Sequence, residues 1–60
     1  MRKLTSKVKY RVVDGHAELY AARKDTGQFE CFATCHLSVL DYIKTNGMKA
    51  AAEGGLLRMR

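Results

Sequence analysis

The 60-residue chain contains no proline, only two cysteines, and no apolar run near the roughly 18 residues that a membrane-spanning helix needs. The absence of proline excludes a proline-rich linker, and so short a chain is expected to form one small domain over residues 1–60. Two cysteines cannot build a disulfide framework, and reduced thiols are typical of the cytoplasm. We therefore expect a cytoplasmic protein without a membrane span or a secretory leader.

The sequence also lacks the patterns that mark common catalytic sites. It contains no glycine-rich phosphate loop, no paired carboxylates at helical spacing and no nucleophile elbow. Glu18 is expected to pair with Arg11, and the side chains of Cys35 and His36 would point in opposite directions along a strand. We therefore predict a protein that is not an enzyme, with no catalytic residue and no cofactor.

Two cysteines and two histidines are the candidates for metal ligands. Structural zinc sites usually hold their ligands as close pairs separated by a longer loop, and that spacing is absent. Strand alternation would place Cys31 and Cys35 on one face and His16 and His36 on the other. A disulfide fails on distance, because four residues of extended strand span about 13 Å. We therefore expect no metal site, and two buried reduced thiols.

Negative charge is scarce, since 6 acidic residues oppose 11 basic ones and the net charge is +5. This balance favours a polyanion or an acidic partner, although basic ends can also serve solubility alone. Much of the positive charge lies near the two ends of the chain, at Arg2, Lys3, Lys7, Lys9, Arg11, Arg58 and Arg60. A chain this short buries only about 60% of its unfolded surface, so a homodimer is an open alternative.

Two turn signals predict an antiparallel sheet. Asp14-Gly15 suits a two-residue type I′ hairpin turn, because both central residues of that turn need positive φ. Asp25-Thr26-Gly27 suits a three-residue loop that ends on glycine in the left-handed conformation. These turns predict strands over residues 7–13, 16–24 and 28–35, of which the middle one pairs on both sides and the other two form the edges.

The expected register separates apolar from polar side chains, which alternate between the two faces along a strand. It places Tyr20 opposite Phe32. A four-residue second loop over residues 24–27 would pair Ala21 with Glu30 and bury that carboxylate, so the three-residue loop is favoured. The inner face would contain Val8, Tyr10, Val12, Ala17, Leu19, Ala21, Phe29, Cys31, Ala33 and Cys35. The outer face would contain Lys7, Lys9, Arg11, Val13, His16, Glu18, Tyr20, Ala22, Glu30, Phe32, Thr34 and His36.

After residue 35 apolar side chains recur at the spacing of a helix, which predicts a helix near residues 37–46. Asn46-Gly47 is a strong stop, because both residues accept the left-handed conformation at a helix end. The start is expected at Thr34, or at Ser38 with Asp41 as a capping box. The apolar residues of this helix are Leu37, Val39, Leu40 and Ile43.

We therefore predict an α+β fold, a three-stranded antiparallel meander with one C-terminal helix packed on one face (βββα). The apolar side of the helix would cover the face that contains Leu19. Residues 1–6 would form a basic lead, residues 7–46 the core, and residues 48–60 a short helix, a further strand or a tail.

The outer sheet face is the predicted binding surface. Cations beside flat aromatic rings suit phosphate contacts combined with base stacking, and we therefore predict nucleic-acid binding. The same composition is typical of protein interfaces, so the alternative is a phage-type accessory protein that binds and inhibits or regulates an acidic host protein. An exposed edge strand or residues 56–60 could then supply the contact by strand addition. The residues concerned are Lys7, Lys9, Arg11, His16, Tyr20, Phe32 and His36.

The predicted order of three antiparallel strands and one helix resembles two families of DNA-binding domain. These are the amino-terminal arm-binding domain of phage integrases and the plant ethylene-response domain, both of which lay the outer sheet face in the major groove. The resemblance covers about residues 7–46, with a basic first strand around Lys9 and Arg11 and the polar Asp25-Thr26-Gly27 turn. It implies DNA binding by this face. Glu18, Ala22 and Glu30 depart from the pattern of these families, because a DNA reader would favour arginine at such outer-face positions.

Overall fold

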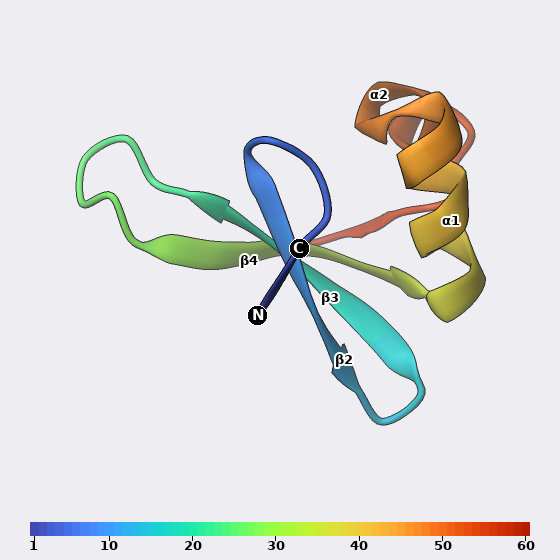
Figure 1. The fold of residues 1–60 in the computed structure, drawn as a ribbon, viewed down its shortest axis with the longest axis horizontal. Helices are drawn as coiled ribbons and strands as arrows, with labels where there is room; N and C mark the ends of the chain where they lie inside the picture. The colour runs from blue at the N-terminus through green and yellow to red at the C-terminus, as the bar shows by residue number, and fades with distance from the viewer.

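A five-stranded antiparallel sheet with two helices on one side forms the computed structural model, which describes all 60 residues (Figure 1). The strands follow one another across the sheet in chain order. The elements are β1 (Arg2–Lys3), β2 (Val8–Val13), β3 (His16–Ala22), β4 (Phe29–His36), α1 (Leu37–Asn46), α2 (Met48–Glu53) and β5 (Arg58–Met59). The predicted three-stranded meander with one helix (βββα) is therefore wrong, because the chain adds a strand at each edge and a second helix.

The two additional strands come from the ends of the sequence. Lys3 of β1 lies opposite Lys9, and Arg58 of β5 lies opposite Thr34. Each strand has two residues, which is too short for an alternating pattern to appear in the sequence. β2 and β4, which were predicted to be the edge strands, are thus each paired with a further strand along part of their length.

The hairpin of β2 and β3 has the predicted register, which is confirmed in all six pairs from Val8↔Ala21 to Val13↔His16. Its turn places Asp14 at φ 49° and Gly15 at φ 80°. Two positive values of φ in succession are what a type I′ turn requires. The twist of this turn matches that of the strands, so the local sequence is sufficient to align them.

The pairing of β3 with β4 contains a bulge that the sequence did not predict. The register is as predicted at Leu19↔Ala33, but it then shifts, and Tyr20 lies opposite Cys31 instead of Phe32. Phe32 is the extra residue, as expected of a β-bulge, in which two residues of one strand oppose one of its partner. The residues of β4 before the bulge therefore have their side chains on the opposite face from the prediction.

The loop between β3 and β4 has four residues, 24–27, and the predicted three-residue loop is wrong. The N–H of Arg23 donates to the carbonyl of Gln28 at 2.8 Å and closes the loop, while Ala21 lies opposite Glu30. The bulge compensates for the longer loop, so the pairs on the helix side of the bulge keep their predicted faces. Glu30 still escapes burial, because this end of the hairpin projects beyond the helices (Figure 1) and its carboxylate accepts from Arg23 at 3.0 Å.

Several side chains consequently differ from the predicted faces. Phe29 and Cys31 lie on the outer face, because Cys31 is opposite the outward Tyr20 and Phe29 is two residues away on the same strand. Phe32 instead packs against the core. Val12, predicted to be buried, is 54% exposed, since α1 packs mainly against β3 and β4.

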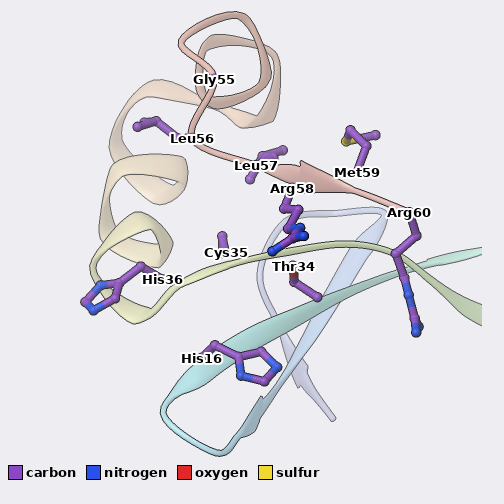
Figure 2. A pocket seen from close by; sticks show the side chains of 10 residues that line it. All are labelled: His16, Thr34, Cys35, His36, Gly55, Leu56, Leu57, Arg58, Met59 and Arg60. Atoms are coloured by element: carbon purple, nitrogen blue, oxygen red, sulfur yellow. The ribbon is translucent and has the colours of Figure 1, made fainter.

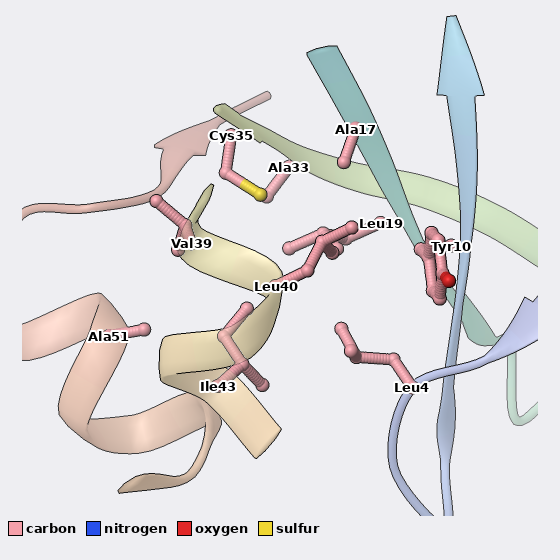
Figure 3. Close-up of a cluster of buried hydrophobic side chains, with 10 residues drawn as sticks. All are labelled: Leu4, Tyr10, Ala17, Leu19, Ala33, Cys35, Val39, Leu40, Ile43 and Ala51. Atoms are coloured by element: carbon pink, nitrogen blue, oxygen red, sulfur yellow. The ribbon is translucent and has the colours of Figure 1, made fainter. Parts of the chain in front are cut away.

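The core lies between the sheet and α1 (Figure 3). Leu19 of β3 and Ile43 of α1 are its largest fully buried side chains, which confirms that α1 covers the face containing Leu19. Leu4, which precedes β2, also reaches this cluster. The buried residues are Leu4, Tyr10, Ala17, Leu19, Ala33, Cys35, Val39, Leu40, Ile43 and Ala51.

Helix α1 has the predicted bounds, but its N-terminal cap differs from both predicted starts. His36 is the cap, and its Nδ1 accepts from the N–H of Ser38 at 3.1 Å. At the other end Gly47 has φ 92°, and its N–H donates to the carbonyl of Ile43 at 2.8 Å. Neither helix has the length and apolar composition needed to cross a membrane.

Candidate functional site

No helix covers the sheet face opposite α1, which we call the open sheet face. Residues opposite one another on neighbouring strands share a face, so the register defines rows of side chains across it. The first row contains Lys3, Lys9, Tyr20 and Cys31. The second contains Arg11, Glu18, Thr34 and Arg58. A third contains Val13, His16 and His36, and a fourth pairs Ala22 with Phe29.

Two aromatic rings on this face each have a cationic side chain positioned over the ring. Lys9 Nζ lies 4.4 Å from the ring centroid of Phe29, and Arg11 Cζ lies 5.7 Å from that of Tyr20. Both distances are within the range of about 6 Å in which a ring quadrupole attracts a cation. The open sheet face therefore presents two neighbouring pairs of a cation and an aromatic ring.

Glu18 is the one carboxylate in these rows, and it is held by its neighbours. Arg11 Nη2 donates to Glu18 Oε1 at 2.7 Å, and the Tyr20 hydroxyl donates to the same oxygen at 3.0 Å. The bond from Arg11, followed by that from Tyr20, lowers the pKa of Glu18 below its usual range. The pKa of Tyr20 is raised, mainly by burial and then by its bond to Glu18, so its hydroxyl remains a donor. The network fixes Arg11 and Tyr20 and neutralises the acidic group.

Most other basic residues of the chain have no ion-pair partner. The four ion pairs use only Arg11, Arg23 and Lys49 as cations. The bases outside these pairs are Arg2, Lys3, Lys7, Lys9, Lys24, Lys44, Arg58 and Arg60. Lys3 and Arg58 lie at opposite edges of the open sheet face, so positive charge extends across its whole width.

Five of the seven predicted site residues lie on the open sheet face. Lys9, Arg11 and Tyr20 are gathered in the middle, on β2 and β3. His16 and His36 lie opposite each other at one end. The Nδ1 of His36 is engaged by Ser38 at the start of α1, which leaves His16 as the freer imidazole of the two.

The other two predicted site residues lie elsewhere. Lys7 lies in the turn between β1 and β2, where its N–H donates to Thr5 Oγ1 at 3.4 Å, and it is exposed outside the strand rows. Phe32 packs against the core because of the bulge, so its predicted place beside Tyr20 is wrong. Phe29 supplies the second aromatic ring instead.

Sequence reasoning missed three residues of this surface. Phe29 was assigned to the inner face, and the signal for its true position was the four-residue loop over residues 24–27. Lys3 and Arg58 lie on two-residue strands, for which neither alternation nor turn chemistry gives a signal. Their basic character alone indicated a role in binding.

The cysteines differ in burial, contrary to the prediction that both are buried. Cys35 lies in the core, where burial raises the pKa of its thiol. Cys31 is half-buried on the open sheet face, and its Sγ donates to the carbonyl of Ala33 at 3.5 Å. Both are free thiols, and nowhere do three His, Cys, Asp or Glu side chains come together in a way that could hold a metal ion.

The chain matches no protein-family model, no curated protein and no solved structure. The resemblance to the arm-binding and ethylene-response domains therefore gains no support, and five strands with two helices differ from the order on which it was based. A function must accordingly be inferred from the residues of the open sheet face themselves.

Proposed function

We propose that the protein binds nucleic acid through the open sheet face. The observation that carries this proposal is the pairing of Lys9 with Phe29 and of Arg11 with Tyr20 on an uncovered sheet face. Unpaired cations at both edges extend the positive surface. Phosphates attract such cations, and bases stack on aromatic rings.

The arrangement favours a single strand over a duplex. A base can stack on Tyr20 or Phe29 only if its own faces are free, which is the case in unpaired DNA or RNA. Lys9 lies over the ring of Phe29, and its flexible side chain can move to a phosphate while a base takes its place on the ring. Each bound nucleotide would thus replace a cation on an aromatic ring with a base on the ring and a phosphate on the cation.

A cytoplasmic location is part of the proposal. Cys31 and Cys35 are both free thiols, and one of them is half-buried rather than enclosed by the core. Thiols of this kind persist in the reducing environment of the cytoplasm. Single-stranded nucleic acid is available in the same compartment.

An acidic host protein is the second candidate partner, and the strand edges favour it. β1 pairs only with Lys9 and Tyr10 of β2, so residues 11–13 have no neighbouring strand on that side. β5 pairs only with Ala33 and Thr34 of β4. A partner could add a strand at either gap, and a second copy of this chain could do so in a homodimer. Residues 56–60 are less available for this contact, because part of them already forms β5.

Titrations with a labelled single strand test the nucleic-acid proposal. Binding should weaken as salt rises, with a log–log slope of about −0.7 per phosphate contact on a single strand, and Lys9→Ala should flatten this slope by about that amount. Phe29→Ala should cost on the order of 1–3 kcal/mol with little change in slope if a base stacks there. Lys49→Ala, on α2, is the control for loss of one positive charge away from the face.

Tyr20→Phe separates stacking from the hydroxyl, because it keeps the ring and removes only the bond to Glu18. We expect it to bind far better than Tyr20→Ala. Wild-type protein that binds neither single-stranded DNA nor RNA at low salt would overturn the proposal. Binding in which Lys9→Ala and Lys49→Ala have equal effects would show that charge alone, and not this face, is responsible.

A further inference from the structure

An open pocket of about 800 Å³ lies at one end of the open sheet face, where β5 separates from β4 (Figure 2). The paired residues end at Thr34↔Arg58, and the chain before Arg58 leads away toward α2. Small-molecule sites typically have volumes of about 300–1,000 Å³, so the pocket has room for one nucleotide. Its ten lining residues include His16, Thr34, Leu56, Leu57, Arg58 and Arg60.

One side of this pocket is basic. Figure 2 shows the side chains of His16 and Arg60 directed to the same side of the sheet, with Arg58 beside Thr34. No aspartate or glutamate is among the ten lining residues, and neither Arg58 nor Arg60 has an ion-pair partner. These side chains can therefore donate several hydrogen bonds to an anion without competition from a side-chain carboxylate.

The nearest carboxylate in the rows is that of Glu18, which lies opposite Thr34. Its Oε1 already accepts from Arg11 and Tyr20. Because this oxygen is already bonded, Arg58 remains unpaired on the far side of Thr34, although it lies in the same row as Glu18. The positive charge at the pocket is thus available to a ligand.

The other side of the pocket is apolar. Leu56 is 39% exposed and Leu57 is partly buried against the core, and Figure 2 shows both on the helix side of β4. An apolar wall next to basic side chains matches a nucleotide, whose base is flat and largely apolar while its phosphate is anionic. Arginine suits the phosphate end, because its planar fork can donate two parallel hydrogen bonds to phosphate oxygens.

We propose that this pocket binds the phosphate of a nucleotide at Arg58, Arg60 and His16, with the base against Leu56 and Leu57. The nucleotide is either the terminal residue of a strand that lies on the open sheet face or a free mononucleotide. The first case rests on the proposed function, since it extends the strand's path to the end of the sheet. The second does not.

The experiment compares three short oligonucleotides of one sequence, which carry a 5′-phosphate, a 3′-phosphate or no terminal phosphate. Wild-type protein should bind one phosphorylated form about tenfold more tightly than the form without phosphate, as expected for a charge-assisted contact. Arg58→Gln should abolish this preference. Lys9→Gln removes the same charge from the middle of the face, so it should weaken all three oligonucleotides and keep the preference.

A nucleoside monophosphate and inorganic phosphate complete the set of ligands. The monophosphate should bind more tightly than phosphate alone and should shift the backbone amide resonances of Leu56 and Leu57. Equal affinity for the two would overturn the assignment of a nucleotide, because the leucine wall would then contribute nothing. Arg58 is exposed, and a circular dichroism spectrum and a thermal melt of Arg58→Gln that match those of wild type show that the variant is folded.

The outcomes separate this inference from the proposed function. Oligonucleotides that bind without any preference for a terminal phosphate, together with no binding of the monophosphate, overturn the pocket and leave the proposed function standing. Binding of the monophosphate without any binding of oligonucleotides supports the pocket and overturns the proposed function. A preference that persists in Arg58→Gln overturns the assignment of the phosphate to this pocket.

Discussion

At the scale of single residues, the bulge decides which side chains lie on the open sheet face. One extra residue in β4 moves Phe29 and Cys31 to the open sheet face and moves Phe32 to the core. The same chemistry of a cation over an aromatic ring results, but with a different phenylalanine from the one that strict alternation indicates. Phe29 also lies nearer the loop end of the hairpin than Phe32 does, and its ring is more exposed there.

The two cysteines should differ in reactivity. Cys35 is buried and its thiol has a raised pKa, so little reactive thiolate forms near neutral pH. Cys31 is half-buried on the open sheet face and should react first with a thiol reagent under native conditions. Labelling of Cys31→Ser and Cys35→Ser, each with one remaining thiol, measures the two rates. Faster reaction at Cys35 would contradict the register given by the bulge.

Glu18 should contribute stability that depends on pH. Its pKa is lowered from the ordinary value of 4.5, mainly because Arg11 donates to the ionised carboxylate. The contribution is therefore present in full above the pKa of the unfolded chain and is lost as pH falls through the lower pKa of the folded state. Glu18→Gln should melt at a lower temperature than wild type near neutral pH, and the difference should shrink below about pH 4.

Thermal melts at a series of pH values measure this difference. Glu53→Gln is the matched control, since Glu53 lies on α2 at 4.0 Å from Lys49 and its side chain is 68% exposed. That substitution should change the melting temperature little, because exposed ion pairs contribute about 0–1 kcal/mol. A difference between Glu18→Gln and wild type that is the same at every pH would show that the network is not electrostatic.

At the scale of elements, the bulge in β4 leads us to expect different losses of stability from Phe32→Ala and Phe29→Ala. Phe32→Ala should lower the free energy of unfolding by roughly 1–3 kcal/mol, because the ring packs against the core while remaining partly exposed. Phe29→Ala should cost less than about 1 kcal/mol, since its ring lies on the outer face and is 36% exposed. Urea denaturation of both variants measures the contrast. The reverse order of stability would support the register without a bulge.

Elements with a strong local signal were predictable from the sequence. The Asp14-Gly15 turn fixed the pairing of β2 with β3, because its twist allows only one alignment of the strands. The spacing of apolar residues and the glycine at position 47 defined α1. The same reasoning placed Lys9, Arg11 and Tyr20 on one face of the sheet, since all three lie within the correctly aligned hairpin.

The remaining features depend on contacts that are distant in the sequence or too short to form a pattern. The bulge at Phe32 and the four-residue loop over residues 24–27 each shift the register by one residue, and beyond the bulge the two shifts cancel. The apolar pattern of the later residues therefore fits a register with both features and a register with neither. β1 and β5 are defined by pairing with β2 and β4, not by their own two residues. The positions of Lys3 and Arg58 on the sheet, and the pocket at its end, could therefore not be predicted from the sequence.

At the scale of the whole molecule, positive charge dominates a chain with a small core. The net charge is +5, and only three of its basic residues take part in ion pairs. A domain of this size has a small margin of stability, so repulsion between its cations is a relevant term. A polyanion on the open sheet face would relieve that repulsion, and binding and stability should accordingly be coupled.

Repulsion between the unpaired cations predicts that salt stabilises the protein. Sodium chloride at about 0.15 M screens charges beyond roughly 8 Å, so repulsion between unpaired cations should weaken more than the few close ion pairs do. The melting temperature should rise by several degrees from low salt, since about 1 kcal/mol corresponds to roughly 4–8 °C in a domain of this size.

Sodium phosphate at equal ionic strength should raise the melting temperature further if Arg58 and Arg60 hold a phosphate. Lys9→Gln combined with Lys3→Gln should reduce the chloride effect and keep the additional effect of phosphate, whereas Arg58→Gln should remove the latter. A melting temperature that falls as chloride is added would show that the ion pairs of Arg11 and Arg23 outweigh the repulsion.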